Sequence, residues 1–245
     1  MQEERFYRAG YGGDLESYRL TIGETDLAIC VPEGVWHEHS GKKTADYITN
    51  QRRLLQEYIV RHPEFASSHT PLPVDKGAPA VARIMMVAAN KAGVGPMAAV
   101  AGTFALLAGR LLSYYSDNVI VENGGDIYLK SSRPRTVGVY AGDSPFSGLV
   151  GVVVPAGKTP CGVCTSSGTV GSSFSYGVAD AALIFAADAP LADAVATAAA
   201  NLVHQPGDVE AAADYALGIE GVYGAVVICK DKLAIAGELE LVKTA

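Results

Sequence analysis

The chain of 245 residues contains little cysteine and no long apolar run. Its four cysteines are Cys30, Cys161, Cys164 and Cys229. They are too few and too scattered for the disulfide framework of a small secreted domain. The longest weakly polar stretch, residues 96–109, is too short and too rich in glycine and alanine to span a bilayer, and residues 1–8 lack the apolar core of a signal peptide. We therefore expect a cytoplasmic protein with no membrane partner.

Positive charge is also scarce. The chain has 19 lysines and arginines against 26 aspartates and glutamates, which gives a net charge of −7. This balance argues against nucleic acid as a partner, but it permits a small anionic ligand held by backbone amides and a metal ion. Hydrophobic residues make up 49% of the chain and charged residues 18%. The length is enough for one large domain or two small ones, and the composition predicts a compact globule with a thick core and some apolar surface for contact within a homo-oligomer.

The pair Cys161-Gly-Val-Cys164 has the spacing of a metal-binding or redox pair. Zinc would need two further ligands, and Cys30 and Cys229 are isolated in the sequence. A redox pair is the other functional alternative. The interpretation we favour is structural, with two half-buried thiols where a strand begins.

Hydrophobic periodicity predicts an alternation of strands and helices. The expected strands cover residues 6–9, 17–22, 26–31, 118–121, 127–130, 137–141, 149–154, 181–186, 224–229 and 233–236. The expected helices cover residues 41–65, 78–91, 96–115, 190–203 and 208–216. A proline, a helix and two strands follow one another at Pro96 and again at Pro190. This repetition predicts an α+β fold with a duplicated helix-plus-antiparallel-sheet architecture.

Asp193, Thr197 and Asn201 are four residues apart in an alanine-rich segment that we expect to be helical. At this spacing the three oxygen-bearing side chains lie in one row on one helix face. A carboxylate and a hydroxyl one turn apart supply part of the oxygen ligand set of a hard cation such as Mg²⁺. We predict that Asp193 and Thr197 bind a metal ion, and such ions often serve to handle phosphate.

Three segments, residues 93–97, 123–126 and 165–171, are dense in residues that leave the backbone accessible. Successive amide groups in such turns, and the free amides of a helix that starts at Pro96, can bind anions. Each turn alone is commonplace, but the three together favour a phosphate-bearing ligand. The predicted ligand contacts are Gly95, Met97, Asn123, Gly124, Gly125, Asp126, Thr165, Ser166, Ser167, Gly168 and Thr169.

Asp126 has two interpretations. It is either a turn residue that bonds its own backbone, or a side chain that binds a ribose or flavin edge or joins the metal. The histidines do not lie beside a plausible nucleophile in the sequence, so no catalytic residue is assigned.

At these residues the chain resembles the ApbE-like superfamily, whose characterised members are FAD:protein FMN transferases. It is most similar to an uncharacterised ApbE-like branch of bacteria and archaea. The matching phrases are Val94-Gly-Pro-Met-Ala-Ala-Val-Ala-Gly102, Val121-Glu-Asn-Gly-Gly-Asp-Ile-Tyr128, Cys164-Thr-Ser-Ser-Gly-Thr-Val-Gly171 and Ala192-Asp-Ala-Val-Ala-Thr197. The resemblance implies a single domain over residues 1–245 with a T-fold-like α+β arrangement, and it equates the last phrase with the transferases' magnesium-binding helix.

The chain also departs from the transferase pattern. Transferases carry a Lys-Gly pair at the start of the first small-residue helix, followed by an aspartate, where this chain has Gly95-Pro-Met-Ala98. They carry a histidine and an Asp-Pro-x-x-Gly turn after Thr-Ser-Gly, where this chain has Ser172-Ser-Phe-Ser175. The resemblance therefore leaves three hypotheses. The first is an Mg²⁺-dependent enzyme that acts on a flavin or other nucleotide diphosphate, for example by transferring FMN from FAD to an acceptor protein or to water. The second is a non-catalytic flavin or metabolite carrier, and the third is a structural partner in a redox assembly.

Overall fold

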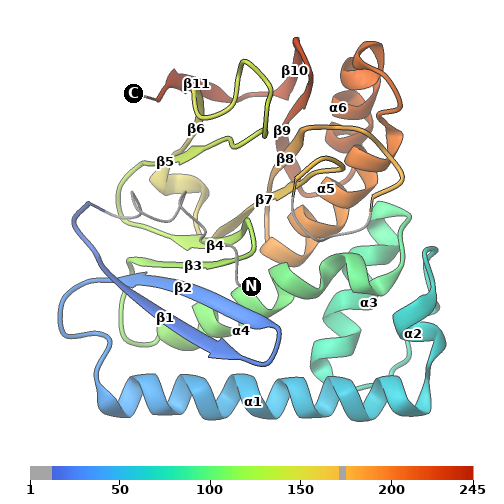
Figure 1. Ribbon diagram of the computed structural model, residues 1–245. Coiled ribbons are helices and arrows are strands. Elements are labelled where there is room, and N and C mark those ends of the chain that lie inside the picture. The colour runs from blue at the N-terminus through green and yellow to red at the C-terminus, as the bar shows by residue number, and fades with distance from the viewer. Residues whose placement is uncertain (1–12, 171–174, 245) are drawn as a thin grey trace.

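Three layers make up the fold of the chain (Figure 1). The computed structural model describes residues 13–170 and 175–244, so the strand expected at residues 6–9 lies outside the described residues. Helices cover one face of an eight-stranded antiparallel sheet, and a smaller three-stranded sheet packs on part of the other face. This is an α+β fold, as the periodicity predicted.

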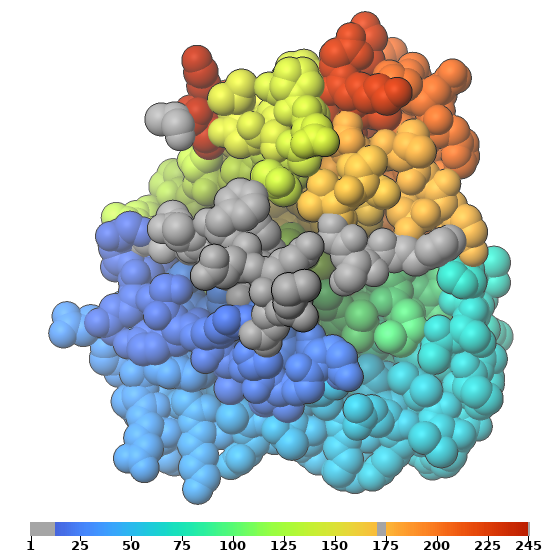
Figure 2. Space-filling model, viewed as in Figure 1, coloured from blue at the N-terminus to red at the C-terminus, as the bar shows by residue number. Residues whose placement is uncertain are grey.

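The large sheet has the order β1-β2-β3-β4-β7-β8-β9-β10. Its strands are β1 (Glu16–Ile22), β2 (Thr25–Val31), β3 (Val119–Asn123), β4 (Asp126–Lys130), β7 (Cys161–Ser166), β8 (Ala181–Ala186), β9 (Val222–Cys229) and β10 (Lys232–Gly237). Each half of the sheet consists of two hairpins with helices between them in the chain. The pairing of β4 with β7 joins the halves. The predicted duplication is confirmed, and the two halves occupy the lower and upper parts of the view in Figure 2.

The small sheet has the order β11-β6-β5 and packs on the face of the large sheet that is turned away from the helices. Its strands are β5 (Arg135–Gly138), β6 (Val150–Val154) and β11 (Glu240–Lys243). Aliphatic side chains from both sheets, among them Val152, Leu183 and Ile228, form a second hydrophobic core there. The sequence pattern did not predict β7 or β11.

The helices are α1 (Glu38–Arg61), α2 (Glu64–Ser67), α3 (Ala80–Ala92), α4 (Val100–Leu112), α5 (Ala189–Leu202) and α6 (Val209–Leu217). The expected helix over residues 96–115 is interrupted, because Pro96–Ala99 forms a 3₁₀ turn, η2, and the α-helix starts only at Val100. Among the described residues no single helix is long and apolar enough to cross a membrane. Residues 80–92 and 96–112 reach the required length and apolarity only together, and they are bent by 105°.

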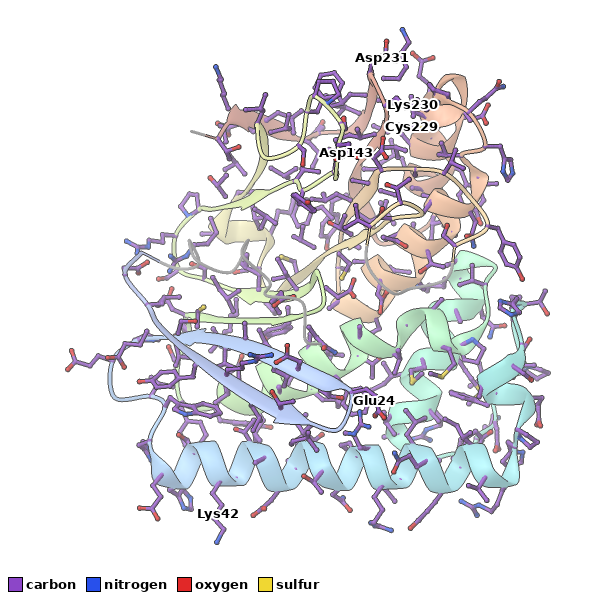
Figure 3. The ribbon with its side chains drawn as sticks, in the orientation of Figure 1. Glu24, Lys42, Asp143, Cys229, Lys230 and Asp231 are labelled. Atoms are coloured by element: carbon purple, nitrogen blue, oxygen red, sulfur yellow. The ribbon has the colours of Figure 1, made fainter. Side chains whose placement is uncertain are left out.

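Helix α1 runs beneath the first half of the molecule and is fastened to the β1–β2 hairpin (Figure 1). Arg52 on this helix pairs with Glu24 and donates a 2.6 Å hydrogen bond to Thr25 Oγ1. Glu24 lies at the tip of that hairpin above the helix, whereas Lys42 points away from the sheet (Figure 3). The amphipathic helix expected over residues 41–65 is thus confirmed, with α2 as a separate turn after it.

Small residues allow α4, α5 and the sheet to approach one another closely. Helix α5 is buried along almost its whole length, and its alanines present little more than backbone to their neighbours. A Cβ atom added at Gly102 would collide with the carbonyl oxygen of Ala189 and lie 2.9 Å from the Cβ of Asp193. Glycine at 102 therefore brings the start of α4 against the start of α5, where the candidate metal ligand is located.

Candidate metal and ligand site

Asp193 lies at the contact between α5 and the first turn of α4. Asp193 is 8% exposed, and its Oδ2 accepts a 2.8 Å hydrogen bond from the backbone N–H of Gly102. The N–H groups at a helix start have no partner within their own helix, so Asp193 caps α4 from a neighbouring helix. Burial raises the pKa of Asp193 from 3.8 to about 7, although the hydrogen bonds from the amides of Gly102 and Ala101 oppose this shift.

Asp126 and Cys164 lie close to Asp193. The two residues face each other across the β4–β7 pairing and are 7% and 0% exposed. Burial raises the pKa of the Cys164 thiol well above its ordinary value, and the carboxylates of Asp126 and Asp193 raise it further. The structure therefore gathers a thiol and two carboxyl groups beneath α5. Asp126 is not an exposed residue at a turn tip.

The Cys161-x-x-Cys164 pair does not form a joint site. A separation of three residues in a strand places two side chains on opposite faces. Cys164 belongs to the core on the helix side and Cys161 to the core beneath the small sheet. Both thiols are free and 0% exposed, so the structural interpretation holds, with the correction that the thiols are fully buried.

The predicted row on α5 is present, but its members have different environments. Thr197 is partly exposed, and its hydroxyl makes no hydrogen bond within the part of the chain that the structure describes. Asn201 Oδ1 accepts hydrogen bonds from Tyr176 N at 2.9 Å and from Ser175 Oγ at 3.1 Å. Asp193 and Thr197 thus lie one turn apart on α5, and their binding of a common ion stays a prediction, whereas Asn201 holds the loop before β8.

Replacing Asn201 with alanine should release that loop. Each of the two hydrogen bonds contributes roughly 0.5–1.5 kcal/mol net, so amide hydrogen exchange at Tyr176 should become about tenfold faster or more. Asn50→Ala on the exposed face of α1 is the matched control and should leave exchange at Tyr176 unchanged. Equal exchange rates in the Asn201 variant and the wild type would show that Asn201 does not hold the loop.

In two of the three predicted anion-binding segments, residues 123–126 and 165–171, several backbone amides already donate hydrogen bonds within the protein. Gly168 N donates to Ala179 O at 2.8 Å, and the amides of Thr169 and Val170 both donate to Ser167 Oγ, at 3.1 and 2.9 Å. The amide of Gly125 donates to Glu122 Oε1 at 2.6 Å. A phosphate bound by these amides would have to displace these bonds. Gly171, the last residue of the predicted segment 165–171, lies outside the described residues.

The remaining predicted contacts fall into two places. Asn123 Nδ2 donates to Ala101 O at 3.1 Å, which brings the β3–β4 turn to the start of α4 beside Asp193. Thr169, in contrast, donates through Oγ1 to Asp180 Oδ1 at 2.8 Å, and Asp180 also accepts from Lys230 N. Lys230 lies at the β9–β10 turn (Figure 3). The segment that contains Thr169 is therefore bonded to that turn.

Gly95 and Met97 lie at the start of η2. A Cβ atom at Gly95 would collide with the backbone of Ser68, so close chain packing already explains this glycine. Met97 packs against the main core. Their predicted contact with a ligand stays a prediction.

The described residues contain no preformed cluster of three or more His, Cys, Asp or Glu side chains arranged as metal ligands. A cation at Asp193 would therefore need hydroxyl, carbonyl, water or phosphate oxygens for the rest of its shell. The sequence had singled out Asp193, Thr197 and Asp126. It had not indicated that Cys164 lies among them, a fact that follows only from the β4–β7 register.

The raised pKa of Asp193 predicts a specific pH dependence of stability in the metal-free protein. In the folded state the carboxyl keeps its proton up to about pH 7, whereas in the unfolded chain it ionises near 3.8. The folded state then binds more protons between these values, so the free energy of unfolding should fall as pH rises from about 4 to 7. Relative to Asp193→Asn, the wild type should lose on the order of 2–4 kcal/mol over this range. Urea titrations of both proteins, with a chelator present, would measure the free energy of unfolding at each pH. A difference between the two proteins that stays constant from pH 4 to 7 would contradict the prediction.

The comparisons with known proteins agree with this architecture. A family model described as "AbpE bacteria" matches residues 9–233. A UPF0280 protein of Methanothermobacter thermautotrophicus is 44% identical over 194 residues, which cover 79% of this chain and 73% of that protein. The UPF0280 protein of Methanocaldococcus jannaschii is 39% identical over 232 residues, which cover 92% and 93% of the two chains.

Two solved structures share the fold at low sequence identity. The ApbE protein of Thermotoga maritima aligns with a TM-score of 0.56 at 13% identity, over 91% of this chain and 97% of its own. The flavinyl transferase ApbE of Pseudomonas stutzeri aligns with a TM-score of 0.52 at 14% identity, over 91% and 94%. The resemblance to the ApbE-like superfamily is thereby confirmed: the chain belongs to the AbpE bacteria family, an ApbE-like branch whose relatives include the archaeal UPF0280 proteins.

Proposed function

We propose that the chain binds a flavin or nucleotide diphosphate together with Mg²⁺ and cleaves or transfers the FMN part of FAD. The observation that carries this proposal is the environment of Asp193. Its carboxyl group is 8% exposed, and its pKa is raised to about 7 by burial. Like the carboxyl group of Asp126, it acts electrostatically on the thiol of Cys164. A divalent cation is the partner that would offset the charge of a buried Asp193 carboxylate.

The residues present fit magnesium. Carboxylate and hydroxyl oxygens are ligands that Mg²⁺ accepts, and it commonly completes its shell with waters and phosphate oxygens. One carboxylate has four lone-pair sites, and the amides of Gly102 and Ala101 take two of them at Asp193. Bound there, the ion would neutralise charge on a diphosphate as its anhydride bond breaks. Thr197 supplies a second oxygen one helical turn away.

The reaction is a substitution at phosphorus. A hydroxyl oxygen, from water or from an acceptor protein, forms a bond to the FMN phosphorus of FAD, and the bond from that phosphorus to the bridging oxygen breaks. The hydroxyl proton passes to solvent, and AMP leaves with the bridging oxygen. The name of the Pseudomonas stutzeri protein, a flavinyl transferase, supports the transfer form of this reaction. In this chain Asp193 and Thr197 would hold the ion, and the β3–β4 turn would contact the nucleotide.

A second candidate is a flavin or metabolite carrier that does not catalyse. It is favoured by the replacement of the transferases' lysine segment with Gly95-Pro-Met-Ala98 and of their histidine segment with Ser172-Ser-Phe-Ser175. A carrier would keep the metal row, because the ion would then serve binding alone.

One experiment separates the candidates. The purified chain is incubated with FAD and Mg²⁺, with and without a chelator, and products are followed by liquid chromatography and mass spectrometry while binding is measured by calorimetry. An enzyme forms AMP with either free FMN or an FMN adduct, and only with Mg²⁺. A carrier binds FAD or FMN and returns it intact. Neither binding nor turnover would rule out both candidates.

A further inference from the structure

A hollow of about 460 Å³ lies on the face of the large sheet that is turned away from the helices. Its floor includes Ile127 and Leu129 of β4 and Val137 of β5, which belong to the second hydrophobic core. Sites for small molecules typically enclose about 300–1,000 Å³ and combine an apolar lining with a few polar groups. The hollow shares no lining residue with the Asp193 site.

The rim of the hollow carries an excess of positive charge. Asp14 binds two guanidinium groups: Arg135 donates from Nη1 and Nη2 at 2.6 and 3.3 Å, and Arg133 pairs with the same carboxylate. No second carboxylate is among the described residues that line the hollow. One negative charge against two positive charges leaves a net charge of about +1.

Arg135 is held in a fixed position by burial and by hydrogen bonds. Its side chain is only 11% exposed, and Nε donates to Ser131 Oγ at 3.0 Å. Burial lowers the pKa of its guanidinium, which means that the charged form is incompletely solvated there. Three of its five N–H groups are used by Ser131 and Asp14, so two are free to bond a ligand, counting the described residues. The planar guanidinium matches carboxylate and phosphate oxygens.

We propose that this hollow binds a small organic anion, a carboxylate or phosphate monoester attached to a compact apolar group. The anionic group lies against Arg133 and Arg135, and the apolar group rests on Ile127, Leu129 and Val137. The site is separate from the proposed flavin site, on the opposite face of the sheet, and does not depend on it.

A second hollow shows why an arginine beside a carboxylate is not sufficient. It lies on α1, where Arg53 pairs with Glu57 at 2.6 Å. The side chains of this pair are more than half exposed, and Val60 is the one aliphatic residue among the described residues that line the hollow. Without an apolar floor it provides no place for the body of the ligand, so Arg53 is a matched control for Arg135.

The test uses the full chain with labelled isoleucine, leucine and valine methyl groups. Benzoate and phenyl phosphate are titrated as probes, and benzamide serves as the neutral analogue of the same size. We expect the anions to shift the methyl resonances of Ile127, Leu129 and Val137, and benzamide to leave them in place. The anion that binds more tightly identifies the preferred acidic group.

Two arginine variants complete the test. Arg135→Gln should weaken binding of the tighter anion roughly tenfold or more, since a charge-assisted pair is lost, and Arg53→Gln should have no effect. Arg133→Gln, at a side chain that is 52% exposed, provides a variant in which the buried packing is untouched. It should also weaken binding. Absence of methyl shifts at saturating anion, equal shifts with benzamide, or unchanged affinity in both rim variants would overturn the proposal.

Discussion

Asp193→Asn should weaken Mg²⁺-dependent binding of FAD roughly 100-fold or more while the chain stays folded. Asparagine keeps the size of the side chain but removes the charge that a hard cation requires. Mutating a residue that only hydrogen-bonds to a metal ligand already lowers metal affinity about 10- to 100-fold, so losing the ligand itself should cost at least as much. Burial of the Asp193 carboxyl, whose pKa is raised to about 7, destabilises the folded state when the group is ionised, and the neutral amide does not carry this penalty. The variant should therefore stay folded, and weaker binding would not result from unfolding. Calorimetric titration with FAD at fixed Mg²⁺, repeated with a chelator, measures the effect.

Two further variants sharpen this prediction. Asp214→Asn makes the same charge change on the exposed face of α6 and should bind FAD as the wild type does. Thr197→Val removes a neutral hydroxyl and keeps the shape, so the expected loss is smaller, about tenfold. If the Mg²⁺ dependence of FAD binding persists in Asp193→Asn, the ion is bound elsewhere and the proposed site is wrong.

Gly102→Ala should lower the stability of the folded chain. The added Cβ would collide with the carbonyl oxygen of Ala189 and press on the Cβ of Asp193 at 2.9 Å, and both belong to a rigid helix. Overpacking of this kind costs roughly 1–3 kcal/mol. For a domain of this size each kcal/mol lowers the Tm by about 2–4 °C, so we expect a decrease of roughly 2–12 °C.

Gly157→Ala is the control for this change. A Cβ at Gly157 meets no atom within 4 Å, so the melting temperature should stay within about 2 °C of the wild type. The Gly102 variant should also bind Mg²⁺ and FAD less tightly, since separating α4 from α5 moves the amides that hold Asp193. A melting temperature equal to that of Gly157→Ala would mean that the two helices are not in tight contact at this point.

The sequence was sufficient for most of the fold because its signals are local. The strand at 181–186 and the helices near 190–203 and 208–216 follow from apolar runs, from a proline at a helix start and from the aspartate before it. The duplication was readable because both halves place a small-residue helix before a hairpin. Strand β7 was missed because Cys161-Gly-Val-Cys164 is buried on both faces and so shows no alternation.

The candidate site was only partly predictable because its geometry depends on contacts that are distant in sequence. Helical spacing alone put Asp193 and Thr197 on one face of α5. That Asp193 caps a helix 91 residues away depends on the packing of α4 against α5, and no local pattern encodes it. The third glycine-rich segment is a similar case. The amides of Thr169 and Val170 are bonded to the nearby hydroxyl of Ser167, a partner that composition does not reveal, and the binding of a ligand there stays a prediction.

The pairing of β4 with β7 has a consequence for how the molecule is held together. Asp126 belongs to the first repeat, Cys164 and Asp193 to the second, and four residue pairs along these strands form the seam of the sheet. A ligand that contacts both repeats would bind only when the two halves of the sheet are paired. By mass action it would stabilise the folded chain against unfolding, by about 2.7 kcal/mol at a ligand concentration 100 times its Kd.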